Sequence, residues 1–352
     1  MSRADFRLSL VVPVYNEEES IDAFISAIDT ELAPLKDQLE IVFVNDGSRD
    51  RTREVVEQAI ARDPRVTLVN LARNFGKEAA MTAGLHQAKG DAIVPMDVDL
   101  QDPPSLILEF VKLWQTGDYD TVYGIRVDRS ADTPMKRLTA GGFYRFFNAL
   151  STSTKLPENA GDFRLIDRKV VEAIKQLPER NRFMKGLFAW AGFRAVGVPY
   201  ERPARHAGET KFNYWKLWNF ALDGLMSFSS WPLRVWSYIG VGVSFIAFLY
   251  ILKIITQVLF FGIDVPGYAS LMSVMLFLGG IQLLSLGIIG EYIGRMFVEV
   301  KQRPVYLIEG VYGQYAKQDE EQKQEVPITS KKSAGKKAAA KAADDQQEQA
   351  SQ

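Results

Sequence analysis

The chain has 352 residues, of which 47% are hydrophobic and 24% are charged, a composition that is ordinary for a folded protein. Its 42 Lys and Arg residues nearly balance its 43 Asp and Glu residues, and the net charge of -1 argues against a general nucleic-acid-binding protein. With no cysteine and two histidines, the sequence excludes disulfides, thiolate metal sites and cysteine nucleophiles, and it leaves little scope for a multi-histidine zinc site.

The first third of the chain alternates short apolar runs with helix-length segments. Arg3, Asp5 and Arg7 precede the first run, which does not resemble a signal peptide, so we expect a cytoplasmic N-terminus. The predicted strands are 8–14, 41–44, 66–71, 92–96 and 121–125, and the predicted helices are 18–35, 50–62, 76–89 and 104–116. Apolar strands that alternate with helices predict an α/β fold with a parallel, doubly wound sheet. Ligands bind such sheets at the carboxyl ends of the strands.

The later part of the chain carries signals of a membrane. An aromatic-rich stretch over 212–231 predicts a helix in the membrane interface, with a buried soluble helix as the alternative. Two uncharged runs follow at 235–252 and 265–290, each near the roughly 20 residues that span a bilayer. Lys253 interrupts the first apolar stretch, and the loop around 262–268 has no Lys or Arg, whereas basic residues flank the pair, at Arg234, Arg295, Lys301 and Arg303. The positive-inside rule then places both termini in the cytoplasm. A buried soluble hairpin is the alternative.

Two carboxylates, Asp97 and Asp99, follow the fourth predicted strand, in Pro95-Met96-Asp97-Val98-Asp99-Leu100-Gln101-Asp102-Pro103-Pro104. Carboxylates two positions apart, where a strand gives way to a loop, can converge on one hard cation. Mg²⁺ and Mn²⁺ prefer such oxygen ligands and keep phosphate oxygens in their shell. The neighbouring Gln101 supports this interpretation, and helix capping by Asp102 is the alternative.

The first two strands also end on polar side chains, in Pro13-Val14-Tyr15-Asn16-Glu17 and Asn45-Asp46-Gly47-Ser48. Both segments belong to the same predicted rim as the two carboxylates. Asp46 can accept hydrogen bonds from a nucleobase or a ribose, and Tyr15 can pack on a base face. Ordinary turn and cap chemistry is the alternative for the second segment.

Taken together, these three motifs resemble glycosyltransferase family 2, whose catalytic domain has the GT-A (Rossmann-like) fold, over about residues 8–230. The two C-terminal apolar runs narrow the resemblance to the polyprenyl-phosphate glycosyltransferases, a group that includes the dolichyl-phosphate mannose synthases. The match looks closest to the bactoprenol glucosyltransferases. Further segments that look like this group, and that extend the resemblance to about residue 308, are 73–78, 161–165, 177–181 and 290–295.

The resemblance implies a set of donor-binding residues. The implied ligands of the divalent metal, Mg²⁺ or Mn²⁺, are Asp97, Asp99 and Gln101. The implied walls of the sugar-nucleotide pocket are Pro13, Tyr15, Glu17 and Asp46. Family members carry Asp where this chain has Asn45, so the contact is carried over to Asp46 alone. The segment 205–211 looks like the family's Arg-x-x-Gly-x-Ser/Thr-Lys loop, in which Arg205 and Lys211 can close over the diphosphate. A mobile surface loop is the alternative.

The acceptor implied by the resemblance is a lipid phosphate, which needs cations near the membrane. Related enzymes bind that phosphate with arginines at positions like Arg126 and Arg137, and we add the neighbouring Lys136. General attraction of this basic run to anionic lipid is the alternative. Asp162 is the carboxylate most like the family's candidate base, but a phosphate monoester has a second pKa of about 6 and needs little help in losing a proton. It can instead orient the acceptor or the sugar hydroxyls, or pair with Arg164.

These inferences predict a membrane-bound inverting glycosyltransferase of the bacterial inner membrane, with Asp99, Asp162 and Arg126 as catalytic residues. It would transfer glucose from UDP-glucose to undecaprenyl (polyprenyl) phosphate at the cytoplasmic face. The alternatives are another donor sugar (mannose or a modified arabinose) and a membrane scaffold that binds a sugar nucleotide without turnover. A homo-oligomer is compatible with the resemblance.

The same inferences divide the chain into five segments. It consists of a GT-A domain over 1–211, an interfacial segment over 212–233, a transmembrane hairpin over 234–294, a cytoplasmic juxtamembrane segment over 295–314 and a disordered tail over 315–352.

Overall fold

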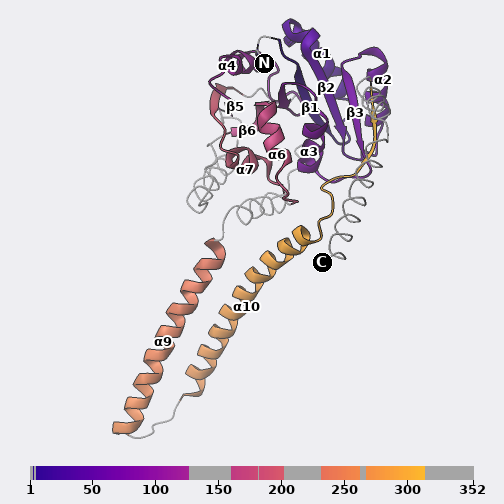
Figure 1. Cartoon of the computed structure of the whole chain (residues 1–352). Coiled ribbons are helices and arrows are strands. Elements are labelled where there is room, and N and C mark those ends of the chain that lie inside the picture. Colours follow the sequence, from indigo (N-terminus) through magenta and orange to yellow (C-terminus); the bar gives the residue numbers. More distant parts are fainter. Residues whose placement is uncertain are drawn as a thin grey trace, which may run out of the picture.

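The computed structural model describes Arg3 and residues 5–126, 160–180, 182–201, 231–261 and 267–313. An α/β domain stands at one end, and two long helices extend away from it (Figure 1). The strands are β1 (Leu8–Val14), β2 (Leu39–Asn45), β3 (Val66–Leu71), β4 (Ala92–Pro95), β5 (Thr121–Arg126), β6 (Ala160–Asp167), β7 (Ala195–Tyr200) and β8 (Ile308–Tyr312). The helices are α1 (Ile21–Glu31), the 3₁₀ helix η1 (Ala33–Gln38), α2 (Thr52–Arg62), α3 (Lys77–Gln87), α4 (Leu106–Gln115), α6 (Arg168–Lys175), α7 (Met184–Trp190), α9 (Trp231–Phe261) and α10 (Tyr268–Val300).

The strands form one mixed sheet in the order β7-β5-β6-β4-β1-β2-β3-β8. The strands β4, β1, β2 and β3 are parallel, as predicted, but β6 runs antiparallel to β4 and β5, and β8 runs antiparallel to β3. The prediction of an all-parallel sheet is therefore wrong. Both antiparallel strands come from outside the alternating first third of the chain, and an antiparallel neighbour needs no crossover helix to reach its place.

The predicted helix over 18–35 is in fact two elements, α1 and η1, with the break after Glu31. Pro34 lies at the start of η1. A proline interrupts an α-helix because it lacks an N–H donor and its ring clashes with the preceding turn. The other predicted strands and helices of this region occur within a few residues of their expected bounds.

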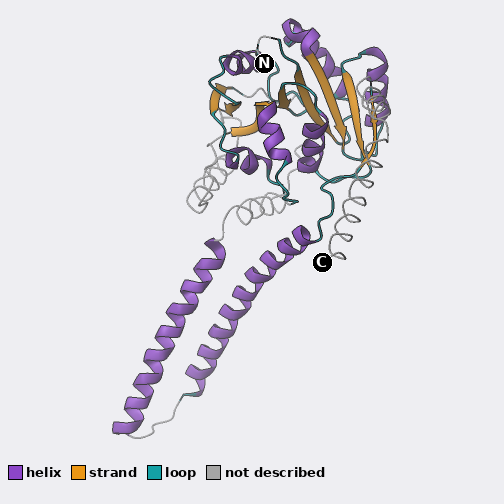
Figure 2. Cartoon of the chain, in the orientation of Figure 1, coloured by secondary structure: helices purple, strands orange, loops and turns teal. Residues whose placement is uncertain are grey.

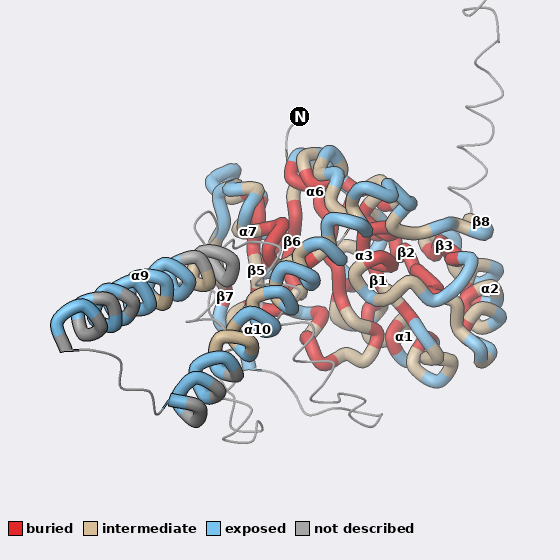
Figure 3. The backbone as a smooth tube through the Cα atoms, turned by 90° about the horizontal axis from the view of Figure 1, so that it is seen from below, coloured by how far each residue is buried: buried red, intermediate tan, exposed pale blue. Residues whose placement is uncertain are grey.

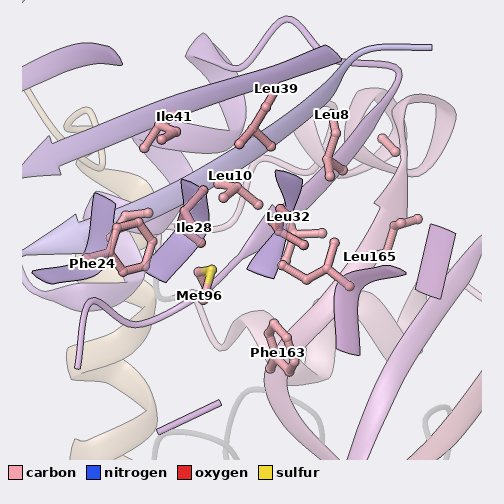
Figure 4. Packing of buried hydrophobic residues seen from close by; sticks show 14 of the residues in the cluster. Leu8, Leu10, Phe24, Ile28, Leu32, Leu39, Ile41, Met96, Phe163 and Leu165 are labelled. Atoms are coloured by element: carbon pink, nitrogen blue, oxygen red, sulfur yellow. The ribbon is translucent and has the colours of Figure 1, made fainter. Parts of the chain in front are cut away.

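Helices cover both faces of the sheet (Figure 2), and a cluster of buried apolar side chains lies on each face. Helices α1, α2 and α4 pack on one face, where Leu8, Leu10 and Phe24 are fully buried (Figure 4). Helices α3, α6 and α7 pack on the other face, against side chains such as Val11. Strand β1 thus has buried residues on both faces, which explains its nearly continuous apolar sequence.

Most described residues of helices α9 and α10 are exposed (Figure 3). Large apolar side chains are among them, such as Phe245, Phe248, Leu283 and Phe297. The stretch Ser273–Val300 of α10 is long and apolar enough to cross a membrane, whereas the apolar stretch of α9, Tyr238–Ile254, is shorter. Within the described ranges one candidate span is therefore found, and the prediction of two transmembrane helices is not confirmed. Most of the expected interfacial segment and all of the tail after residue 314 lie outside the described residues.

The segment after α10 returns to the α/β domain, which the sequence did not predict. Strand β8 adds to the sheet beside β3, and Arg53 of α2 hydrogen-bonds the Tyr312 hydroxyl at 2.9 Å. Before the strand, the Tyr306 hydroxyl lies 2.7 Å from Nδ1 of His86 on α3. At the end of α10, the Glu299 carboxylate accepts a 2.9 Å hydrogen bond from the Arg180 backbone N–H. The C-terminal end of α10 and the segment after it are thereby attached to the α/β domain at several points.

Candidate active site

A pocket of about 320 Å³ lies at the carboxyl ends of β1, β2 and β4, which are neighbours in the sheet. Parallel strands of this kind end at one rim, which is why segments far apart in sequence meet there. The walls are Pro13, Val14, Tyr15, Glu17, Asp46, Asn74, Gly76, Lys77, Ala80, Asp97, Val98 and Asp99. Six residues that the sequence analysis singled out therefore lie together. The Tyr15 side chain is 38% exposed, so its ring is accessible to a ligand.

The carboxylates of Asp97 and Asp99 stand in the loop after β4. Asp99 accepts a 3.2 Å hydrogen bond from the Gln101 backbone N–H, and Leu100 between them has a left-handed backbone with φ of 55°. An aliphatic residue rarely adopts that conformation, and such strain clusters at functional sites. The Gln101 side chain is buried and is not a wall of the pocket.

The donor set of this loop suits a hard divalent cation. Among the described residues, no group of three or more His, Asp or Glu side chains is placed to hold a metal ion. Two carboxylates supply hard oxygen ligands, and Mg²⁺ and Mn²⁺ characteristically complete their shells with water and substrate phosphate. Asp97 already attracts one cation, because the Lys77 ammonium lies 2.5 Å from its Oδ1. The residues present therefore fit a metal that is shared with a phosphate-containing ligand.

Lys77 joins two carboxylates, since its Nζ also lies 3.9 Å from Oδ2 of Asp162. Burial alone would lower the pKa of this lysine, but the charges of Asp97 and Asp162 outweigh burial and raise the pKa above its usual value. The sequence analysis did not assign Lys77 to the site. The available signal was its position at the start of a helix, where the helix dipole disfavours a cation unless nearby anions compensate.

Asp46 holds the loop that leads to Lys77. Its two carboxylate oxygens accept hydrogen bonds from the backbone N–H groups of Phe75 (2.7 Å) and Gly76 (2.9 Å). Burial raises the pKa of Asp46 and outweighs these two bonds, which lower it. The adjacent Gly47 has φ of 66°, and a Cβ there would come within 2.5 Å of the Asn74 backbone nitrogen. Any nucleoside contact by Asp46 must therefore use the lone pairs that the loop leaves available.

Asp162 on β6 lies just behind the pocket. A second cavity, of about 10 Å³, has Asp162 in its wall and shares Pro13, Lys77 and Asp97 with the main pocket. The Lys185 ammonium lies 4.0 Å from Oδ1 of Asp162. Burial would raise the pKa of this carboxyl, but Lys185 and Lys77 outweigh burial and lower it. A carboxylate with a lowered pKa is a weak base.

Arg126 ends β5 on the same side of the sheet and is positioned by two partners. Its Nε donates a 3.2 Å hydrogen bond to the Tyr200 hydroxyl, which donates a 2.5 Å bond to Oδ1 of Asp102. Burial and the Asp102 charge raise the pKa of Tyr200 to about 12, so its proton stays in place near neutral pH. Arg126 is not a wall of the main pocket, yet its charge contributes to the lowered pKa of Asp162. The other predicted cations, Lys136, Arg137, Arg205 and Lys211, lie outside the described residues.

Comparison with known proteins supports the interpretation of the motifs. The family "Glycosyl transferase family 2" matches residues 9–175, and the family "GtrB C-terminal hairpin" matches residues 231–296. A bactoprenol glucosyl transferase of Shigella phage SfII is 52% identical over 86% of this chain and 97% of its own length. A prophage bactoprenol glucosyl transferase homolog of Escherichia coli strain K12 is 51% identical over 87% of this chain and 99% of its own length.

Among solved structures, glucosyl-3-phosphoglycerate synthase from Mycobacterium tuberculosis, in complex with Mn²⁺, UDP-glucose and phosphoglyceric acid, aligns with a TM-score of 0.42 and 21% identity. The alignment covers 64% of this chain and 80% of that one.

An α/β domain with carboxylates at the sheet rim, together with relatives that share half of their residues over nearly their whole length, defines the class. The chain belongs to glycosyltransferase family 2 and is a glycosyltransferase. Within that family it is similar to the bactoprenol glucosyl transferases, in both the α/β domain and the helical hairpin. The predicted family and enzyme class are confirmed.

Proposed function

We propose that this glycosyltransferase moves a hexose, glucose in the first instance, from a UDP-sugar to undecaprenyl (polyprenyl) phosphate at the cytoplasmic face of the bacterial inner membrane. The observation that carries the proposal is the rim pocket, in which Asp97 and Asp99 meet Tyr15, Glu17 and Asp46. The names of the bactoprenol glucosyl transferase relatives support the lipid acceptor.

The donor would lie along the rim with its base against the accessible ring of Tyr15. Asp97 and Asp99 would hold Mg²⁺ or Mn²⁺, which when bound offsets the charge of the departing diphosphate. Lys77 places a further positive charge beside Asp97 and limits the repulsion between Asp97, Asp162 and an anionic ligand. Arg205 and Lys211 would close over the diphosphate.

The acceptor phosphate would meet Arg126, whose guanidinium is held by Tyr200 and Asp102 and so needs little reorganisation to bind an anion. Arg137 and Lys136 would add to this binding. A phosphate oxygen attacks the anomeric carbon, the bond from that carbon to UDP breaks on the opposite face, and the anomeric configuration inverts. The products are UDP and a polyprenyl-phosphate sugar. Asp162 would orient the acceptor or the sugar, since its lowered pKa makes it a poor proton acceptor.

The membrane part would anchor the enzyme beside its lipid substrate. The apolar span of α10 and the exposed apolar side chains of α9 support a hairpin in the bilayer, with residues 1–211 and the segment after α10 on the cytoplasmic side. A homo-oligomer remains part of the proposal, to be tested by the mass of the purified enzyme.

The test is an assay of the purified full chain with UDP-glucose, Mg²⁺ and undecaprenyl phosphate. We expect UDP release that requires the lipid, and a loss of at least about 100-fold in Asp99→Ala but not in Asp118→Ala, which changes an exposed acid remote from the pocket. A donor panel, read by the mass of the lipid product, identifies the sugar. Binding of UDP-sugars without turnover of any donor would contradict the proposal and favour the scaffold.

A further inference from the structure

A chain of side-chain hydrogen bonds connects the strand after the membrane helices to the rim pocket. Glu309 on β8 accepts a hydrogen bond from Nδ2 of Asn70 on β3. Oδ1 of Asn70 in turn accepts a 2.6 Å bond from Nδ2 of Asn45 at the end of β2. Asn70 and Asn45 are 3% and 2% exposed, so water does not readily replace the bond between them, whereas the Glu309 side chain is partly open to solvent.

The chain continues into the loops that form the pocket. Oδ1 of Asn45 accepts the Ser48 backbone N–H at 3.1 Å, and the Ser48 hydroxyl accepts the Asn16 backbone N–H at 3.0 Å. Asn16 lies between Tyr15 and Glu17, and Asp46 follows Asn45 directly, so three walls of the pocket are next to members of the chain. Asn16 itself has a left-handed backbone, with φ of 54°, and depends on such contacts to keep that conformation.

The direction of these bonds is determined at both ends. At one end a backbone N–H can only donate, which turns the oxygen of Asn45 toward Ser48 and its NH₂ group toward Asn70. At the other end the Glu309 carboxylate can only accept, which turns the NH₂ group of Asn70 toward β8. Both amides therefore have a single satisfactory orientation.

This direction gives a local reason for an amide, rather than a carboxylate, at Asn45. Aspartate at position 45 could still accept from Ser48, but it could not donate to Asn70. Asn70 would then face acceptors on both sides, and either the buried junction with position 45 or the partly exposed junction with Glu309 would set oxygen against oxygen. The amide at position 45 and the carboxylate at position 309 are therefore complementary hydrogen-bond partners of Asn70, across β2, β3 and β8.

We propose that Glu309 is a positioning residue for the sugar-nucleotide pocket and acts through Asn70 and Asn45 on the turn at 45–48. The segment after the membrane helices thereby helps to shape the donor site. This inference rests on the proposed function for the identity of the ligand, but the hydrogen-bond chain can also be tested without substrate.

The test is a set of variants of the full-length chain in detergent. We expect Asn45→Asp to raise KM for UDP-glucose about fivefold with kcat changed less than about twofold, because the substitution disturbs binding and not the reacting groups. Adding Glu309→Gln should return KM to within about twofold of the original, since a glutamine NH₂ group can donate to Asn70. Glu309→Gln alone should have little effect, because its side-chain oxygen can still accept.

The matched control is Asn45→Asp with Glu57→Gln. Glu57 lies 2.8 Å from Arg53, the same arginine that faces Glu309 at 3.6 Å, so this change removes one negative charge from the same surface without touching Asn70. Rescue by Glu57→Gln as strong as rescue by Glu309→Gln would overturn the proposal and leave only a charge effect. An unchanged KM in Asn45→Asp would also overturn it.

Amide hydrogen exchange provides the readout that does not depend on turnover. Asn45→Asp should speed exchange in 45–49 and in β8, and Glu309→Gln should restore the original rates while Glu57→Gln does not. Absence of turnover of every UDP-sugar by the unmodified chain would contradict the proposed function, whereas an unchanged exchange pattern in Asn45→Asp would contradict the hydrogen-bond chain.

Discussion

The rim of the sheet is built from alternating charges that hold one another in place. Lys77 stands between Asp97 and Asp162, and Arg126 is fastened by Tyr200 and Asp102. Each cation would be mobile on its own, since long side chains lose considerable entropy when they are fixed. The carboxylates offset that loss, so the positive groups are in place before an anionic substrate arrives.

Removing the hydroxyl of Tyr200 should weaken binding of the acceptor. Tyr200→Phe takes away the bonds to Arg126 and Asp102, and we expect KM for undecaprenyl phosphate to rise about three- to tenfold with KM for UDP-glucose nearly unchanged. The control is Tyr123→Phe on the adjacent strand β5. An equal effect of the two substitutions, or an effect on the donor alone, would count against a role of Tyr200 in positioning Arg126.

Glu78 should make the stability of the domain depend on pH. Burial and the nearby Asp162 raise its pKa from 4.5 to about 7, while its Oε2 accepts the Met184 backbone N–H at 3.0 Å. The Glu78 carboxyl therefore binds its proton more tightly in the folded chain than in the unfolded chain. The stability that this protonation contributes is complete below about pH 4.5 and is lost as the pH rises through about 7.

The substitution Glu78→Gln stays uncharged and can still accept from Met184. We expect it to raise the melting temperature by about 2–4 °C at a pH near 8, with the difference vanishing near pH 4.5, as followed by tryptophan fluorescence. Glu54→Gln, the same change on the exposed face of α2, is the control and should leave the curve unchanged. A constant difference across the pH range would show that the ionisation of Glu78 is not responsible.

At the scale of elements, close packing of α3 on the sheet sets the position of Lys77. Gly84 faces the sheet, and a Cβ there would come within 2.9 Å of a Val44 methyl carbon and nearer still to one of Val11. Neighbouring residues Ala80 and Ala83 are also small and fully buried. Small side chains let the helix approach the strands, and the approach brings its first residue, Lys77, to Asp97 in the loop after β4.

Gly84→Ala should therefore destabilise the domain although alanine is the better helix former. We expect a loss of about 1–3 kcal/mol in the free energy of unfolding, because the added methyl group must displace α3 or the strand residues. Gly279→Ala adds the same group to α10 where no atom lies within 4 Å, and it should not destabilise the α/β domain. Denaturant unfolding measures the free energy of unfolding of both variants, and equal values for Gly84→Ala and Gly279→Ala would refute the packing argument.

At the scale of the molecule, the helical pair leaves the α/β domain and the chain then returns to it through β8 (Figure 1). The return closes a loop of more than a hundred residues between β7 and β8, held at its end by sheet pairing and by the contact of Arg180 with Glu299. On the α10 side, the helical pair and the rim pocket are consequently connected through defined contacts and not through a free linker.

The absence of cysteine makes the membrane orientation directly testable. A membrane-impermeant maleimide should label Asp264→Cys, between the two apolar runs, in intact spheroplasts. It should label Ser26→Cys, on the exposed face of α1, only after the membrane is permeabilised. The reverse pattern, or labelling of both in intact cells, would contradict the proposed orientation.

Local sequence was sufficient for the elements and for much of the pocket. Apolar runs and turn residues predict β1 to β5, and the rule that parallel strands end at one rim brings Tyr15, Asp46 and Asp97 together without any coordinates. The same motifs were specific enough to identify the family. Periodicity and strand ends are properties of short segments, and short segments can be read in isolation.

The tertiary structure alone decided the antiparallel places of β6 and β8, the position of Lys77 between two carboxylates, and the matched pair of Asn45 and Glu309. Each of these depends on a contact between groups that are distant in the chain. The free energy of such a contact depends on which strand lies beside which, and no local pattern encodes that choice. The sequence thus determined the chemistry available at the rim, and the fold determined which groups face one another there.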